Sequence, residues 1–501
     1  RADSRVVRVV QRGRIGFAAV VGTVSANTLP PADGAAPRDV AVARSPRVWL
    51  ILAAILAVGL VARVALWQSF AGVLLHHDEV EYNEIATHLA EEGRFAAAQG
   101  QLTSIRPPLF PASVAAIYRL FGVGNFQAVR AAQGLLSLGT VVLVFLLARR
   151  LYDDRVALWA AGLACFYPSL LVYNNLLLSE ALFTLGLAAI VLATVSYLQS
   201  PSLAKMTLVG ALVGVGALTR SVLWLFPPVL GGYLLIVAPV AWPRRLAGVA
   251  LMVVAFLVVI APWAWRNTRL EQTLITIDCM GGRNLMMGNY EHTPLTRSWD
   301  AIGVGGEQAW YRVLARRYPE FRQMTQGQRD KLAMREGIRF VMAHPGLTIQ
   351  RDVIKFFNFW QLERELVSAA LAGEFGAMPK PAVALIALVV AGGYAVVILL
   401  AIAGAVLFPP GDWRAYTLLL LVMAYICLLH TLVFAHSRYH LPLVPLLVIF
   451  AASAIAQRQR LLSYRGKWQG WLAGAIVLVL VGGWVTEIIT VDIARIQERL
   501  S

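Results

Sequence analysis

Long apolar runs constrain this chain more than any other feature. The first runs from Trp49 to Phe70, and about 20 such residues cross the roughly 30 Å hydrocarbon core of a bilayer as a helix. Similar runs follow at 126–148, 156–173, 181–198, 206–219, 222–241, 246–265, 382–408, 416–435, 440–456 and 470–490. Backbone polar groups in lipid must be satisfied within their own segment, so each run is predicted to be helical. We therefore predict an all-α polytopic membrane protein with about 11 transmembrane helices.

The composition agrees with this fold class. Hydrophobic residues make up 58% of the 501 residues, charged residues make up 14%, and the mean hydropathy is +0.65. These values exclude an ordinary soluble domain. The continuity of the runs also speaks against a transmembrane β-barrel, whose strands alternate between apolar and polar residues. Membrane lipids are predicted partners, and nucleic acid is not.

Basic residues in alternate short loops predict the orientation. Residues 1–48 form a predicted basic cytoplasmic tail, and the loops around Arg149, Lys205, Arg244, Arg414 and Arg458 share its side. The chain then divides into an N-terminal transmembrane module, 49–265, a long outer loop, 266–381, and C-terminal transmembrane helices, 382–501. The first outer loop of the module is 71–125. We predict a multi-pass protein of a bacterial inner (plasma) membrane whose site faces the outside.

Carboxylates are concentrated just after the first apolar run. Six of the 28 acidic residues fall between Asp78 and Glu92. In the same stretch Tyr82, Ile85 and Leu89 recur at helical spacing, which predicts a helix lying in the membrane interface. Asp78 and Glu81 also fit a capping box, in which the side chains satisfy the amides that open a helix. Asp78 is therefore either a site residue, a helix cap, or both.

Two further segments are predicted to be interfacial rather than spanning. Leu109 to Phe121 is apolar but too short to cross a bilayer, and Pro107-Pro108 and Gly122 bracket it. Leu347 to Leu362 has a helical pattern rich in aromatic residues, which favours the membrane interface. Packing of this second segment against the bundle is the alternative.

Histidines near the acidic stretch do not form a recognisable metal motif. His76 and His77 are adjacent, so their side chains point in different directions on a helix, and His88 lies farther along. Their spacing from the carboxylates matches no standard site. We predict no metal ligands and no required cofactor, and a divalent metal is kept as an alternative.

The motifs of the outer loops resemble those of the GT-C glycosyltransferases. The most similar branch comprises the protein O-mannosyltransferases and the lipid A aminoarabinose transferases. The matching motifs are Asp78-Glu79-x-x-Tyr82, Arg106-Pro107-Pro108, Leu178-Ser179-Glu180, Pro262-Trp263-x-x-Arg266-Asn267, Gly281-Gly282-x-Asn284, Gly288-Asn289 and Ser437-Arg438-Tyr439. They extend over most of residues 50–456. The aminoarabinose branch has Arg where this chain has Glu81, which leaves the transferred sugar open.

This resemblance implies a polyprenyl-phosphate-linked sugar as donor and an acceptor hydroxyl on a lipid, a glycan or a protein. It implies transfer with inversion, Asp78 as the base, and Glu79 and Glu180 as further catalytic candidates. An ionised carboxylate near the aqueous edge can take the hydroxyl proton as attack develops. Glu180 can also position the acceptor, contact a metal, or pair with Arg220.

Arginines are the predicted partners of the donor phosphate. Arg106 and Arg438 match basic positions of the family and, with Tyr82, form the predicted phosphate site. Their alternative role is snorkelling toward lipid headgroups. Arg63 lies within the first span, where an unpaired charge is costly, so it pairs with Glu180 or phosphate, or snorkels.

Asn284 and Asn289, in the glycine-rich part of the long outer loop, are predicted on the acceptor or sugar side. The glycines beside them allow the backbone to approach a ligand closely.

Two other functions remain open on sequence alone. One is a membrane transporter, although transporter sites usually lie near the bilayer midplane on broken helices. The other is a non-catalytic GT-C-like subunit of a larger membrane assembly.

Overall fold

The computed structural model describes residues 46–492, where the regular secondary structure is helical apart from one isolated bridge between Ala96 and Leu102. Eight helices in this part are long and apolar enough to cross a membrane. Seven of them are α1 (Pro46–Ser69), α4 (Phe126–Leu151), α7 (Glu180–Gln199), α10 (Trp242–Glu271), α16 (Lys380–Leu407), α17 (Trp413–Leu432) and α19 (Trp468–Glu487). The eighth joins the 3₁₀ turn η6 (Ser437–Leu443) to α18 (Val444–Ala456). The predicted all-α polytopic class is confirmed.

The expected count of eleven spans is not confirmed, because three of the predicted runs form shorter helices. Run 156–173 divides into α5 (Asp154–Cys165) and α6 (Pro168–Tyr173). Proline has no amide proton and disfavours helix in the residue before it, which explains the break ahead of Pro168. The other two runs give α8 (Leu203–Thr219) and α9 (Phe226–Val237), and α9 opens on two prolines.

The centre of the bundle is α18, which packs against α16, α5 and α4. At another contact, α8 and α10 approach closely because α8 carries glycine there. A Cβ on Gly210 would lie 2.0 Å from the backbone oxygen of Met252. Small residues at such crossings allow backbones to come together, and van der Waals packing replaces the hydrophobic effect that lipid does not supply.

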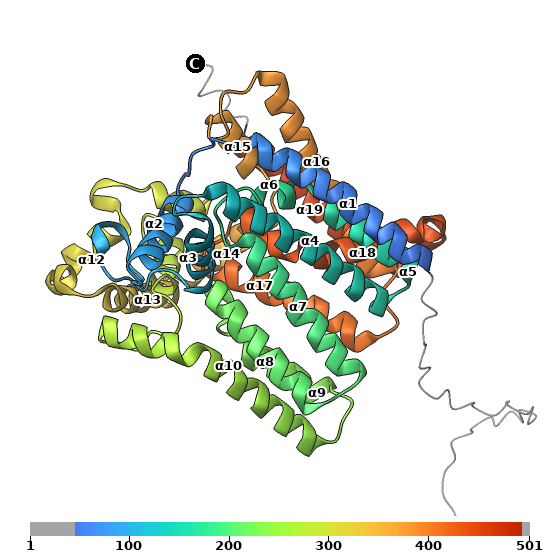
Figure 1. Ribbon diagram of the computed structural model, residues 1–501, viewed down its shortest axis with the longest axis horizontal. Helices are drawn as coiled ribbons and strands as arrows, with labels where there is room; N and C mark the ends of the chain where they lie inside the picture. Colours follow the sequence, from blue (N-terminus) through green and yellow to red (C-terminus); the bar gives the residue numbers. More distant parts are fainter. Residues whose placement is uncertain (1–45, 493–501) are drawn as a thin grey trace, which may run out of the picture. The chain divides into compact units, whose positions relative to one another are not determined.

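Shorter helices gather at one end of the long ones (Figure 1). From the first outer loop come α2 (Asp78–Glu91) and α3 (Leu109–Phe121). From the long outer loop come α11 (Gly281–Gly288), α12 (Trp310–Arg317), α13 (Gln326–Ala343), α14 (Pro345–Phe359) and α15 (Glu365–Leu371). The remaining turns are η1 (Ala98–Gly100), η2 (Ser221–Leu223), η3 (Ser298–Gly303), η4 (Gly306–Gln308), η5 (Pro319–Gln323), η7 (Arg458–Tyr464) and the π-helical η8 (Ile488–Asp492).

The predicted apolar stripe of α2 is confirmed, and its partner is α3. Tyr82, Ile85 and Ala86 are buried. The Tyr82 ring meets the Phe110 ring edge-on at 4.9 Å, and the Tyr118 hydroxyl donates to Asn83 Oδ1 at 2.6 Å. The two helices therefore pack together as one unit.

Helix α14 buries several of its polar side chains and exposes several of its apolar ones. The buried residues include Arg351 and Lys355, whereas Ile349 and Val353 are 66% and 54% exposed. Lys355 Nζ bonds Asp352 at 3.1 Å and Asn289 at 3.0 Å. This inverted pattern is typical of a helix whose outer face meets lipid. Packing of this segment against the bundle is therefore confirmed, and its placement at the membrane interface stays a prediction.

The predicted division of the chain into a tail, two transmembrane modules and a long outer loop stays a prediction. Residues 1–45 of the cytoplasmic tail predicted for 1–48 lie outside the described residues. The last three residues of that predicted tail belong to α1, which begins at Pro46.

Candidate functional site

Asp78 is the first residue of α2 and follows the short segment 70–77 that connects α1 to α2. The preceding residue, His77, has φ of 50° and ψ of −120°, and no side chain caps the helix. The predicted capping box of Asp78 and Glu81 is therefore wrong. Both carboxylates turn instead toward arginines from elsewhere in the chain, since a charge-assisted bond is stronger than a bond to a neutral amide.

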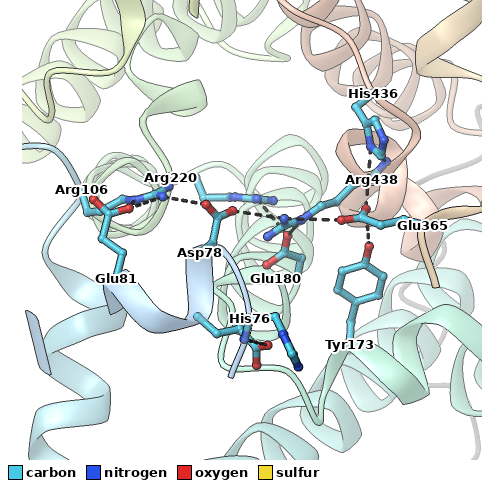
Figure 2. Close-up of polar contacts among 11 residues, drawn as sticks. His76, Asp78, Glu81, Arg106, Tyr173, Glu180, Arg220, Glu365, His436 and Arg438 are labelled. Atoms are coloured by element: carbon cyan, nitrogen blue, oxygen red, sulfur yellow. Dashed lines mark hydrogen bonds and ion pairs between the residues drawn. The ribbon is translucent and has the colours of Figure 1, made fainter. Parts of the chain in front are cut away.

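Arg106, which lies in the first outer loop just before α3, bonds the carboxylates of both Asp78 and Glu81 (Figure 2). Its Nη2 donates to Asp78 Oδ1 at 2.8 Å, and its Nε and Nη2 donate to Glu81 Oε2 at 2.8 and 2.5 Å. The guanidinium also lies over the Tyr82 ring, 5.0 Å from its centroid. Tyr82 thus positions Arg106 as a cation–π partner.

Arg438 approaches the other oxygen of Asp78 from η6. Its Nη1 is 3.2 Å from Asp78 Oδ2, and its Nε donates to Glu180 Oε1 at 2.5 Å. Its Nη1 also lies 3.8 Å from Glu365 Oε1. Arg438 therefore joins three carboxylates that come from the first outer loop, α7 and α15 (Figure 2).

Glu180, the first residue of α7, closes the deep side of this cluster. Its side chain is 1% exposed, and Arg220 Nη2, just beyond α8, donates to the same Oε1 at 3.0 Å. The predicted pairing of Glu180 with Arg220 is confirmed. The other oxygen, Oε2, is buried and has no hydrogen-bond partner within the described residues.

The electrostatics keep Asp78 ionised. Burial raises the pKa of the Asp78 carboxyl, but the guanidinium groups of Arg106 and Arg438 lower it by more than that, so that the pKa is about 2. The Asp78 side chain is still 37% exposed, while those of Arg106 and Arg438 are 15% and 9% exposed. The site is thus a set of oppositely charged groups that opens to solvent on the side of Asp78 and Arg106.

Glu365, which no sequence pattern singled out, lies in the same cluster. The Tyr173 hydroxyl donates to Glu365 Oε2 at 2.7 Å, and His436 Nδ1 lies 3.8 Å from that oxygen. Burial raises the pKa of Glu365, although Arg438 opposes the shift. A small cavity of about 10 Å³ lies here, between Glu365, Arg438, Tyr173 and their neighbours, which is the size of one water molecule.

Two more charged residues reach this cluster from the long outer loop. Arg283 on α11 interacts electrostatically with Arg106, Glu81 and Asp78, and its Nε is buried with no hydrogen-bond partner among residues 46–492. Asp278 interacts with Arg106, and burial raises its pKa to about 6. Neither residue was singled out from the sequence, because an isolated charge in a long loop carries no periodic signal.

Glu79, predicted as a second catalytic carboxylate, points away from the cluster. Its Oε1 accepts from the Leu177 amide at 2.6 Å and its Oε2 from the His76 amide at 3.2 Å. Burial raises the pKa of Glu79, and these two amides oppose the shift. The side chain fastens the start of α2 to the segment before α7.

Arg63 is also separate from the cluster. It is buried in α1, where Nη2 donates to Ser137 Oγ at 2.8 Å and Nη1 to the backbone oxygens of Gly59 and Cys165 at 3.1 and 3.2 Å. The pairing with Glu180 proposed from the sequence is not found. The charge is satisfied within the bundle by α1, α4 and α5.

The two asparagines of the outer loop have different surroundings. Asn289 is fully buried, and its side chain bonds Leu285, Leu432 and Lys355. Asn284 is half-buried on α11. The backbone was expected to approach a ligand closely at the neighbouring glycines, but in the structure it approaches the backbone of another helix instead. A Cβ on Gly282 would lie 1.8 Å from the Asp330 oxygen.

No group of three or more His, Cys, Asp or Glu in the described residues has the arrangement of a metal site. His77 bonds Glu374 at 3.2 Å and His88 bonds Glu92 at 3.0 Å, so both histidines have carboxylate partners other than Asp78. The cluster instead offers an ionised and partly exposed carboxylate, that of Asp78, beside several arginines. That arrangement can accept a proton and bind an oxyanion at adjacent positions.

Residues 105–265 match the family model of the dolichyl-phosphate-mannose-protein mannosyltransferases. The match covers less than half of the chain and includes Arg106, Glu180 and Arg220. It confirms the resemblance to GT-C glycosyltransferases that the motifs predicted. No curated protein sequence matches the chain.

Solved structures with similar folds include those of two different proteins. ArnT from Cupriavidus metallidurans bound to undecaprenyl phosphate is 18% identical, with 89% of this chain and 73% of that chain covered and a TM-score of 0.48. The archaeal oligosaccharyltransferase AglB from Archaeoglobus fulgidus, in complex with an inhibitory peptide and a dolichol-phosphate, is 13% identical, with coverage of 88% and 55% and a TM-score of 0.48. The present chain spans about half the length of that oligosaccharyltransferase.

Proposed function

We propose that this chain is a membrane glycosyltransferase that moves a sugar from a polyprenyl-phosphate donor to an acceptor hydroxyl, with inversion. The observation that carries the proposal is Asp78 ionised between Arg106 and Arg438 at the mouth of the site. The family match over 105–265 supports the same chemistry. The proposed location is a bacterial inner membrane, with the site on the outer face.

In the proposed step, the acceptor oxygen attacks the anomeric carbon while Asp78 takes the hydroxyl proton. The bond between that carbon and the phosphate oxygen breaks, and its electron pair leaves with the phosphate. General-base help of this kind contributes about 10²–10⁴ in rate. Arg106 stabilises the charge that develops on the leaving phosphate, because a preorganised cation there needs no rearrangement during reaction.

The surroundings of Asp78 favour this role over a transporter site. Glu180 begins α7, Arg220 follows α8, and Arg438 precedes α18, so the charged groups lie at helix ends. Substrate sites of secondary transporters usually lie near the midplane on interrupted helices. A non-catalytic subunit would retain the charges without turnover, and only an assay separates it from an enzyme.

The test is a transfer assay with the purified full chain in lipid nanodiscs. Polyprenyl-phosphate hexoses and pentoses are supplied as donors, with membrane lipid, glycan and peptide acceptors, and release of polyprenyl phosphate is measured. We expect release with at least one donor. Tight donor binding without release would favour the subunit. If no polyprenyl phosphate or sugar derivative of it binds, the proposed function is wrong.

A further inference from the structure

Asp78 bonds the same two arginines that are the proposed partners of the donor phosphate. Its Oδ1 takes Arg106 at 2.8 Å and its Oδ2 takes Arg438 at 3.2 Å, so both oxygens of the proposed base are engaged. Carboxylate and phosphate are both recognised by the fork of an arginine through charge-assisted bonds. A base held by two arginines is poorly placed to accept a proton, because those bonds stabilise the ionised form.

The exposure of the side chains indicates where an incoming anion could replace Asp78 as the partner of an arginine. Asp78 is 37% exposed and Arg106 is 15% exposed, so an anion from outside reaches this pair first. Arg438 is 9% exposed and remains bonded to the buried Glu180. Arg438 is therefore the fixed partner, and Arg106 is the one that an incoming phosphate contacts.

Arg106 does not depend on Asp78 for its position. Two bonds to Glu81 and the Tyr82 ring hold it from α2. When Asp78 releases Arg106, the guanidinium stays where it is and presents its charge to the new anion. This explains why the chain has Glu81 beside Tyr82: the second carboxylate anchors the arginine.

We propose that Asp78 is an internal substitute for the donor phosphate, which occupies Arg106 in the empty site and is displaced from it when the donor binds. The inference rests on the proposed function and deepens it. Phosphate binding and release of the base become one event, so Asp78 can accept the acceptor's proton only with the donor in place. The exchange itself breaks and forms ion pairs, and no proton or covalent bond moves.

The charges facing Asp78 set the balance of this exchange. Arg106 and Arg438 attract it at bonding distance, and Arg220 adds to that attraction. Glu81 shares Arg106 with it, and Glu180 and Glu365 share Arg438. Arg283 approaches from α11. If only the Asp78 charge is removed, Arg106 keeps Glu81, Arg220 keeps Glu180, and Arg438 keeps Glu180 and Glu365. The variant site therefore stays assembled, and its more positive charge attracts anions more strongly.

The experiment measures binding of farnesyl phosphate to the purified full chain, with farnesol as the uncharged comparison. Asp78→Asn should bind farnesyl phosphate about tenfold more tightly than the wild type, a typical coupling between competing groups. Farnesol affinity should not change. The matched control is Glu91→Gln, which removes the same charge from an exposed position at the far end of α2.

The outcomes separate this inference from the proposed function. If Asp78→Asn binds farnesyl phosphate no more tightly than the wild type, or if Glu91→Gln gains as much, Asp78 is no competitor and the inference is wrong while the function stands. If the wild type does not prefer farnesyl phosphate to farnesol, both are overturned. Asp78→Ala provides a second variant in the same assay, should the Asn variant not fold.

Discussion

At the scale of single residues, we propose two tasks for Asp78, one in each of two states of the site. With Arg106 and Arg438 on its two oxygens it neutralises the cluster, and without Arg106 it has an oxygen to offer a hydroxyl. Glu79, one residue on, has neither, because its oxygens face two backbone amides.

The chemical step should fail when the base is removed. Asp78→Asn keeps the size of the side chain and cannot take a proton at neutral pH. We expect turnover to fall by about 10² or more, the scale of general-base help, with normal expression and tighter binding of donor phosphate. Single-turnover transfer by the purified variant measures this. Turnover close to the wild-type rate would remove Asp78 from the mechanism and make Asp278 the next candidate.

The pH dependence should reflect the depressed pKa of Asp78. The ionised form is the competent base, and with a pKa of about 2 it prevails at every pH above that value. Activity supported by Asp78 is therefore lost only as the pH falls through about 2. Since kcat/KM reports groups of the free enzyme, it should show no loss from this carboxyl between pH 8 and 4. An acidic limb near pH 6 would point to Asp278 instead.

Glu79 should affect stability rather than chemistry. Glu79→Gln keeps one acceptor and places an NH₂ group against an amide donor, so a buried bond is lost. We expect a cost of about 1–3 kcal/mol in the free energy of unfolding and turnover near that of the wild type. Thermal unfolding of the full chain gives the first quantity, and Glu91→Gln is again the matched control. A large loss of turnover in well-folded protein would restore Glu79 as a catalytic candidate.

At the scale of elements, the outer loop is assembled by close backbone contact between α11 and α13. Gly282 faces the Asp330 backbone oxygen, and Asp330 Oδ1 accepts from the Arg283 amide at 2.9 Å. This contact determines where Arg283 lies relative to Arg106. The glycines that the sequence associated with a ligand are thus used to bring two helices together beside the site.

Substitution of these neighbouring glycines should have unequal effects. In Gly282→Ala the new Cβ would lie 1.8 Å from backbone, which forces α11 and α13 apart, whereas in Gly281→Ala the nearest atom is the flexible Met334 Cε at 3.5 Å. We expect Gly282→Ala to lower the melting temperature and weaken donor binding, and Gly281→Ala to do neither. Equal behaviour of the two variants in thermal unfolding would contradict the contact.

At the scale of the whole molecule, the site is the meeting point of segments far apart in the chain. Asp78, Glu180, Glu365 and Arg438 come from the first outer loop, α7, α15 and η6. Each lies at or beside the end of a helix, so antiparallel packing of the long helices brings them to one side. The orientation of the bundle therefore decides which face of the membrane carries the chemistry.

Topology can be measured with single cysteines introduced at exposed positions. We expect Cys in place of Glu291 to react with a membrane-impermeant maleimide added to intact cells, and Cys in place of Arg458 to react only after permeabilisation. Both positions are exposed, whereas Cys165, Cys279 and Cys427 are buried and give little background. The reverse pattern would place the site in the cytoplasm.

The sequence by itself determined the fold class, because burial in lipid requires long apolar helices and each run declares itself locally. It also predicted the α2 stripe and the short helix 109–121, and it included the pairing of Glu180 with Arg220 among three alternatives. The number of spans differed from the prediction, since hydropathy does not show where Pro168 breaks a run or how short α8 and α9 become.

Only the tertiary structure decided the partners of each charge. Asp78 and Glu81 fit a local cap equally well as a pattern, but Arg106 outcompetes the backbone amides because a full positive charge binds a carboxylate more strongly. Arg63 and Glu79 carried the same kind of signal as the site residues, yet packing satisfied them elsewhere. Glu365, Arg283 and Asp278 had no signal at all. A charge becomes part of a site through what surrounds it in space, and spacing along the chain does not encode those surroundings.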